Sequence, residues 1–394
     1  MRRKMLVVWP PEIPVSANCF TYHYIDFIEP ISYLVNLGYD VDFIDMGLLN
    51  QHKQELYLKF TDRPNKIAIY CDFHLIQSAI ESIKLARIMS PTSEILIYGP
   101  IISLFSKNIL EIENGLLVGC TGDYETILEN FYTDNYKERI VDGYWLDSKN
   151  MQPINLNLFN PHDYQRLIDL DRNRNQELNV GIGVSRGCSY SCEYCRTTLE
   201  SDSVDRRVPI DKIMNFIDNA QRNHNINSFK FISPNFAQNR EWVFDFLDAV
   251  KKKGVTWKCC TRVEYFDDES FAELFKEAGC VSVSVGLESY DETALSGIKR
   301  VNSNIYKGIH NLSKHRISIK GMVMLGIPGS DFMKTKEWIA SLEKMGVAVR
   351  PTIYTDYKNI KFADLPFADK RLCVHDGQNV EMVEMCLDRN GKMY

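Results

Sequence analysis

The stretch SRGCSYSCEYC, residues 185–195, brings three cysteines together at C-x3-C-x2-C spacing. One tight loop can then aim the thiolates of Cys188, Cys192 and Cys195 at a single point. Structural zinc sites usually take four protein ligands, whereas an iron–sulfur cluster held by three thiolates leaves one iron open. Because no fourth cysteine follows at short spacing, we interpret the loop as a [4Fe-4S] site with a vacant corner. The alternatives are a zinc loop or cysteines that only pack.

The cysteine spacing, with Tyr194 before the last cysteine, resembles the radical S-adenosylmethionine (radical SAM) enzymes, in the subgroup with an N-terminal cobalamin-binding-type domain. The likeness covers roughly residues 4–330 and includes three downstream motifs: Thr261-Arg262, Gly286-Leu287-Glu288-Ser289 and Met324-Leu325-Gly326-Ile327-Pro328-Gly329. It implies that the open iron binds S-adenosylmethionine through its amino and carboxylate groups. An electron from an external flavodoxin- or ferredoxin-type donor would then give a 5'-deoxyadenosyl radical, which takes hydrogen from the substrate.

The bulk composition is that of a soluble protein with two to three domains. Of the 394 residues, 45% are hydrophobic and 25% are charged, and a domain usually has about 100–200 residues. The formal net charge of −6 argues against a broad nucleic-acid surface, and no apolar run is long enough to cross a membrane. Because the N-terminus leads into a strand rather than a cleavable signal, we expect a cytoplasmic protein whose eleven cysteines stay reduced.

The first third of the chain alternates apolar strands with amphipathic helices. We expect strands at 5–9, 40–45, 66–71, 94–99 and 115–119, and helices at 27–37, about 75–89 and from about 124. This alternation predicts a parallel, doubly wound α/β (Rossmann-like) sheet over residues 1–133, with ligands bound beyond the carboxyl ends of its strands. Those ends fall near Pro10-Pro11, Asp72, Gly99-Pro100 and Gly119-Cys120.

A polar connector over residues 134–178 precedes a second βα series, over residues 179–345, that begins at 180–184. Its further strands are expected at 228–232, 256–261, 282–286, 319–325 and 348–354, and its helices at 209–222, 240–252, 267–278, 291–297, 303–314 and 332–345. A closed barrel needs eight such units. The resemblance implies a partial, open (β/α)6 barrel, followed by a C-terminal strand and tail over residues 346–394.

The resemblance also implies residues that hold the cofactor at the carboxyl ends of the barrel strands. Tyr194 would pack against the adenine, or be an ordinary ring over the loop. Ser233 and Asn235 follow the second strand, where relatives often carry an acid that helps to hold the methionine moiety. Their presence in place of that acid makes direct contact with the cofactor's ammonium group less secure.

Three further elements complete the implied site. Arg262 ends the third strand and would bind the cofactor's carboxylate or ribose, or instead form a salt bridge to Glu264 or Glu288. Glu288 would touch the cofactor or Arg262. The segment Gly326-Ile327-Pro328-Gly329 would offer backbone groups to the adenine edge, or simply end a strand.

The N-terminal segment leaves cobalamin binding open. The cobalt-ligating pattern D-x-H-x-x-G is absent, and His23 lacks both the acid and the glycine. Tyr98-Gly99-Pro100 replaces the usual Gly-Gly-Pro, and Gly119-Cys120-Thr121-Gly122-Asp123 replaces Gly-Glu-Gly-Glu. Glycine at such turns lets a flat corrin and its nucleotide tail approach the backbone, whereas a tyrosine could cap the site or fill it.

Two enzymatic hypotheses follow. The first is cobalamin-dependent C-methylation in natural-product biosynthesis. The second is a radical SAM maturase that rearranges, cleaves, cyclises or epimerises its substrate without cobalamin, with the N-terminal domain as a scaffold. The substrate is a small molecule or a peptide, and a peptide would need a separate recognition partner because no winged-helix segment is present.

Overall fold

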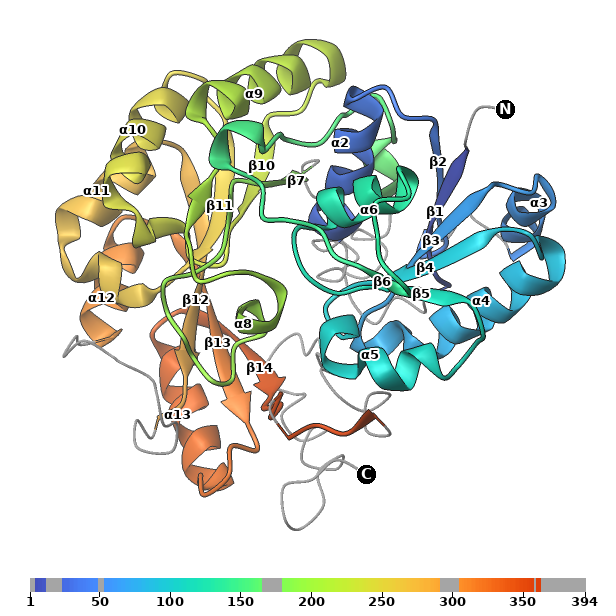
Figure 1. The fold of residues 1–394 in the computed structure, drawn as a ribbon. Coiled ribbons are helices and arrows are strands. Elements are labelled where there is room, and N and C mark those ends of the chain that lie inside the picture. The colour runs from blue at the N-terminus through green and yellow to red at the C-terminus, as the bar shows by residue number, and fades with distance from the viewer. Residues whose placement is uncertain are drawn as a thin grey trace. The chain divides into compact units, whose positions relative to one another are not determined.

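The computed structural model describes residues 4–11, 23–48, 53–164, 179–290, 305–357 and 359–362, which divide into two compact units (Figure 1). The first unit comprises the described residues up to 164, with the short segments 199–202 and 360–362. The second comprises the remaining described residues between 179 and 359. The helix expected at 291–297 and most of the C-terminal tail lie outside the described residues.

The first unit is built on a six-stranded sheet in the order β2-β1-β3-β4-β5-β6, in which every neighbouring pair is parallel. This arrangement confirms the predicted doubly wound fold. The short β6 falls in the segment expected to be connector, and the sequence did not predict it. The strands are β1 Met5–Trp9, β2 Val41–Asp45, β3 Lys66–Tyr70, β4 Glu94–Tyr98, β5 Leu116–Gly119 and β6 Ile140–Val141.

Helices connect these strands as the periodicity predicts. Gly38, at φ +85°, follows the end of α2, and Asp72 caps the turn η2 by accepting a hydrogen bond from the backbone N–H of Phe73. The π-helix η1 and the helices α3 and α5 were not predicted. The elements are η1 His23–Ile28, α2 Glu29–Asn36, α3 Lys53–Thr61, η2 Phe73–Leu75, α4 Ile76–Met89, α5 Ile102–Leu110, α6 Tyr124–Tyr132 and η3 Ser148–Asn150.

The second unit contains an open sheet of six parallel strands in the order β7-β10-β11-β12-β13-β14. Consecutive strands are neighbours, as in a (β/α)8 barrel that stops short of closure, so the expected partial barrel is confirmed. The strands are β7 Asn179–Gly183, β10 Ser228–Ile232, β11 Thr256–Thr261, β12 Cys280–Glu288, β13 Ser318–Leu325 and β14 Val347–Ile353.

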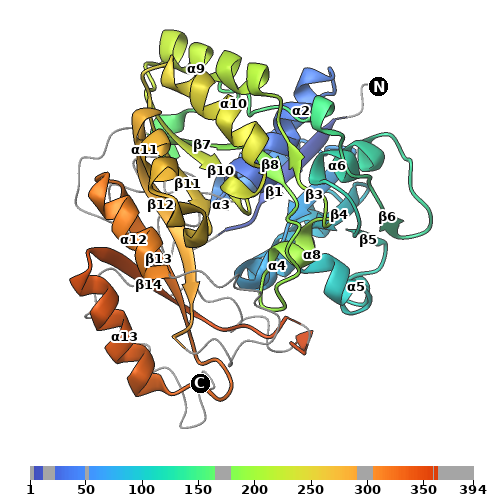
Figure 2. The same cartoon turned by 90° about the vertical axis from the view of Figure 1, so that its left-hand side faces the viewer.

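The two faces of this sheet differ sharply. Helices α9 to α13 lie along one face (Figures 1 and 2), where the strands place buried side chains such as Phe229, Phe231 and Trp257. The alternate residues are more polar and only half-buried, and they line what we call the inner face. The helices are α9 Ile210–His224, α10 Arg240–Lys251, α11 Glu269–Glu277, α12 Ile305–Lys314 and α13 Phe332–Lys344.

Candidate functional site

The three cysteines lie in the loop that follows β7 and the two-residue strand β8, Ser185–Arg186. All three thiols are free and half-buried, and the backbone N–H of Cys195 donates to the carbonyl of Cys192 over 3.0 Å. Burial raises the pKa of the Cys188 and Cys195 thiols, and the neighbouring Cys192 thiol also raises it. The loop therefore gathers three thiols at the carboxyl end of the first barrel strand.

Among the described residues, no three His, Cys, Asp or Glu side chains form a site for a single metal ion. In an iron–sulfur cluster each thiolate binds a different iron, so the sulfurs stay farther apart than around zinc.

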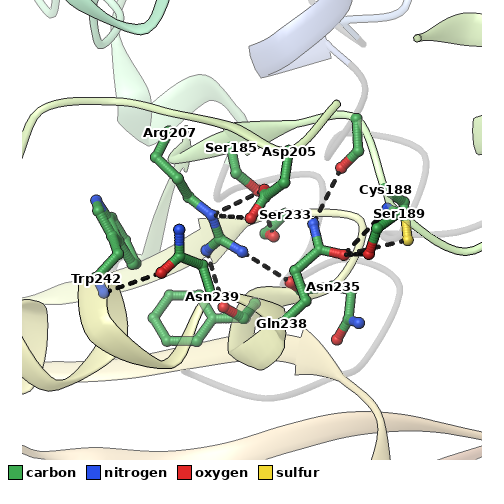
Figure 3. A network of polar contacts seen from close by, with 12 residues as sticks. Ser185, Cys188, Ser189, Asp205, Arg207, Ser233, Asn235, Gln238, Asn239 and Trp242 are labelled. Atoms are coloured by element: carbon green, nitrogen blue, oxygen red, sulfur yellow. Dashed lines mark hydrogen bonds and ion pairs between the residues drawn. The ribbon is translucent and has the colours of Figure 1, made fainter. Parts of the chain in front are cut away.

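Gln238, at the end of the turn η4 (Phe236–Gln238), holds the first part of the cysteine loop (Figure 3). Its Oε1 accepts from the Cys188 thiol over 3.5 Å and from the Ser189 backbone N–H over 3.4 Å. Its Nε2 donates to the carbonyl of Gly187 over 3.4 Å. One side chain thus bridges three consecutive residues of the loop, a role that the sequence analysis missed.

Arg207 holds η4 in turn. It lies on β9 (Arg206–Arg207), which pairs antiparallel with β8. Its guanidinium donates to the carbonyls of Phe236 and Asn235 over 2.8 and 3.2 Å, pairs with Asp205 over 2.8 Å and lies 4.9 Å over the Trp242 ring (Figure 3). The cysteine loop therefore rests on a turn that is fixed by a buried cation.

Ser233 and Asn235 lie beside this loop, but their polar groups have protein partners. The Ser233 and Ser185 hydroxyls are hydrogen-bonded over 2.5 Å. Asn235 accepts from the Thr261 hydroxyl over 3.0 Å and donates to the Tyr265 hydroxyl over 3.1 Å. Both residues are buried, so their contact with the cofactor stays a prediction.

Arg262 forms the salt bridge to Glu264 that the sequence analysis gave as an alternative, over 2.8 Å. Its guanidinium also lies 4.5 Å over the ring of Tyr190, within the cysteine loop. Contact with a cofactor carboxylate stays a prediction for this residue.

Glu288 ends β12 in an unusual backbone conformation. Its φ is +62°, and the register between β12 and β13 shifts between Gly286 and Glu288. The side chain folds back over the backbone of Gly286, so that a Cβ added there would collide with the carboxylate. A side chain at 286 would therefore displace the Glu288 carboxylate from this position.

Tyr194 lies close to Glu288 and to the end of β13. Burial raises the pKa of the Tyr194 hydroxyl, and the nearby Glu288 and Cys192 raise it further. The ring packs against Met324 and Ile327, next to the turn that runs through Gly326 (φ +75°) and Pro328. The structure thus brings Tyr194, Glu288 and the expected adenine-binding turn together with the cysteine loop.

In the first unit, aromatic side chains occupy the carboxyl ends of the strands. Trp9 stacks on Tyr70 with ring centroids 4.3 Å apart, at the β1–β3 switch point where doubly wound sheets bind ligands. Tyr98 contacts Tyr70 and Tyr124, is fully buried, and its hydroxyl has no hydrogen-bond partner in the described part of the chain. Its ring is thus packed inside the first unit at the carboxyl end of β4, and both roles considered for it, capping or filling a cobalamin site, stay predictions.

Comparison with known proteins identifies the second unit. Residues 182–339 match the family model of the radical SAM superfamily. The chain is 22% identical over 210 residues to bacteriochlorophyllide d C-12(1)-methyltransferase of Chlorobaculum tepidum, covering 52% of this chain and 45% of that protein. It spans about half the length of the curated relatives that it matches first.

Two solved structures share the fold across both units. The radical SAM methyltransferase TsrM of Kitasatospora setae, solved with cobalamin and a [4Fe-4S] cluster, matches with a TM-score of 0.68 at 14% identity, over 90% of this chain and 75% of that one. The cobalamin-dependent radical SAM enzyme OxsB, with aqua-cobalamin bound, matches with a TM-score of 0.67 at 16% identity, over 96% and 57%. None of the described helices is long and apolar enough to span a membrane.

Proposed function

We propose that this chain, whose residues 182–339 belong to the radical SAM superfamily, is a cobalamin-dependent radical SAM methyltransferase acting on carbon in a small-molecule substrate of natural-product biosynthesis. The observation that carries the proposal is the half-buried loop of three free thiols at the carboxyl end of β7. The methyl-transfer step is supported by curated relatives that are methyltransferases, among them hopanoid C-2 methylase of Rhodopseudomonas palustris.

The described residues fit a [4Fe-4S] cluster and S-adenosylmethionine. Cys188, Cys192 and Cys195 would bind three irons, and the cluster, when bound, supplies the electron that cleaves S-adenosylmethionine to a 5'-deoxyadenosyl radical. That electron would come from an external flavodoxin- or ferredoxin-type donor. Tyr194 and the turn at 326–329 would hold the adenine, because the Tyr194 ring already packs against Ile327 of that turn.

The polar residues would orient the cofactor's methionine part. Arg262 would bind the carboxylate of the cofactor's methionine part, either in place of Glu264 or together with it. Glu288 would accept hydrogen bonds from the cofactor's ammonium or ribose groups. Ser233 and Asn235 would act mainly by holding the strand ends, since their side chains already have protein partners.

The described residues of the first unit fit cobalamin less well than those of the second unit fit the cluster and S-adenosylmethionine. Trp9, Tyr70 and Tyr98 fill the ends of β1, β3 and β4 and are at most 1% exposed, so a corrin would lie beyond these covered rings rather than between the strands. Cobalamin, when bound, carries the methyl group to the substrate.

The test is anaerobic reconstitution of the protein with iron and sulfide, followed by hydroxocobalamin and desalting. We expect one corrin per chain by visible absorbance, and 5'-deoxyadenosine on addition of S-adenosylmethionine and a reductant. Cys192→Ala should retain the corrin and lose the 5'-deoxyadenosine. A wild-type protein that has an intact cluster but binds no corrin would contradict the methyltransferase proposal.

A second candidate is a radical SAM maturase that works without cobalamin. The observation in its favour is Tyr98, which fills the position where the subgroup usually has glycine. The first unit would then be a scaffold, and a peptide substrate would require a separate recognition protein. The absence of corrin absorbance together with active cleavage of S-adenosylmethionine would select this candidate.

A further inference from the structure

Tyr190 lies in the middle of the cysteine loop, two residues after Cys188 and two before Cys192, and contacts the segment that follows β11. The guanidinium of Arg262, the first residue after β11, lies 4.5 Å from the centroid of the Tyr190 ring. The Tyr190 hydroxyl lies 3.5 Å from the hydroxyl of Tyr265, at the outer limit of a hydrogen bond. The ring and the hydroxyl of Tyr190 thus contact different residues of this segment.

The contact between Arg262 and the Tyr190 ring is largely shielded from water. The side chain of Arg262 is 20% exposed, and that of Glu264, its ion-pair partner over 2.8 Å, is 13% exposed. Attraction between a cation and an aromatic ring strengthens when water is excluded. The ion pair draws the guanidinium toward Glu264, whereas the ring holds it against the cysteine loop. Tyr190 therefore helps to determine where the charge of Arg262 lies.

Other hydrogen bonds limit where the Tyr190 ring can lie. The Tyr265 hydroxyl accepts from Asn235 over 3.1 Å, and Asn235 accepts from the hydroxyl of Thr261, the last residue of β11, over 3.0 Å. Gln238 holds the preceding residues of the loop from the turn η4. The loop is thus attached both to η4 and, through Tyr190, to the end of β11, which restricts the position of the ring.

We propose that Tyr190 is a positioning residue for S-adenosylmethionine, because its ring holds the Arg262 guanidinium beside the cysteine loop, in place to bind the cofactor's carboxylate. The inference rests on the proposed function and adds a residue that sets the affinity for the cofactor. The carboxylate must lie next to the cluster, since the open iron would bind it together with the amino group. An arginine that contacts a residue between two cluster ligands meets this requirement. The ring is then essential for the effect, and the hydroxyl is not.

Anaerobic titration calorimetry of the reconstituted full-length protein with S-adenosylmethionine, without reductant so that the cofactor stays intact, tests the proposal. We expect Tyr190→Leu to weaken binding about tenfold, the effect of losing a partly buried cation–π contact. Tyr190→Phe keeps the ring and should bind within about twofold of the wild type. The matched control is Tyr306→Leu, at an exposed tyrosine on α12, which should bind as the wild type does. If Tyr190→Leu loads less iron than the wild type, Tyr190→Met, which fills more of the ring's space, takes its place.

Decarboxylated S-adenosylmethionine shows whether the effect concerns the carboxylate, because it keeps the adenine, sulfonium and ammonium groups. Its affinity should be the same in the wild type and in Tyr190→Leu. Unchanged affinity for S-adenosylmethionine in Tyr190→Leu, or an equal loss for the two ligands, overturns the inference. So does a loss in Tyr190→Phe as large as in Tyr190→Leu, since the hydroxyl would then be responsible.

The electron paramagnetic resonance signal of the reduced cluster, recorded on the same samples, separates failure of the inference from failure of the proposed function. A reconstituted wild type without this signal contradicts the proposed function. A normal signal in the wild type and the variants, together with equal affinities, overturns only the role of Tyr190.

Discussion

Replacing Arg207 with methionine tests whether this buried cation holds the turn η4, on which the cysteine loop rests. Methionine keeps most of the apolar stem but removes every donor. The change deletes the 2.8 Å pair with Asp205 and the hydrogen bonds to the carbonyls of Phe236 and Asn235. The side chains of Arg207 and Asp205 are only 6% and 14% exposed, so an uncompensated carboxylate stays largely out of water.

The magnitude follows from that burial. Breaking a buried ion pair by removing one partner costs about 3–5 kcal/mol, and hydrogen bonds to charged groups contribute about 1.5–3 kcal/mol each, without being additive. Because Asp205 keeps some contact with water, we expect the low end, a loss of about 3 kcal/mol in the free energy of unfolding.

Urea denaturation followed by circular dichroism measures this loss, and iron per chain after reconstitution measures its effect on the loop. We expect iron content to fall with stability, because η4 carries Gln238 and Gln238 contacts the cysteine loop. Arg207→Lys should recover part of both losses, since it keeps the charge. The control is Arg222→Met, an exposed arginine on α9, which should leave both unchanged. A loss under about 1 kcal/mol with full iron would refute the reasoning.

The remaining predictions concern single substitutions. Cys192→Ala should abolish iron uptake and 5'-deoxyadenosine formation while the circular dichroism spectrum stays native; undiminished cleavage of S-adenosylmethionine would end the cluster assignment. Gln238→Met should speed iron loss to a chelator about fivefold, the equivalent of about 1 kcal/mol for a lost hydrogen bond, and an unchanged rate would remove Gln238 from the loop's support. Gly99→Ala should destabilise the first unit by about 3 kcal/mol in urea, because φ is +139° and a Cβ would collide with the carbonyl of Cys71. Tyr98→Phe should keep or raise stability by up to about 1 kcal/mol, since its hydroxyl has no partner among the described residues; a clear loss would reveal one.

Apart from the two-residue strand β6, the strands of both sheets could be predicted because parallel strands buried on one or both faces leave apolar runs in the sequence. The spacing of Cys188, Cys192 and Cys195 was enough to predict that one loop carries all three thiols. The sequence did not reveal the role of Arg207, because Arg206-Arg207 reads as a solvated basic pair. A two-residue strand has no period to recognise, and the carbonyls that Arg207 binds lie about 30 residues later.

The choice between the partners of Arg262 was equally beyond the sequence. Glu264 and Glu288 both follow at plausible distances, and only the structure places Glu264 within 2.8 Å. Glu288 instead has a backbone φ of +62°, and its carboxylate lies over Gly286. A positive φ is rare for glutamate, and no local residue pattern announces it.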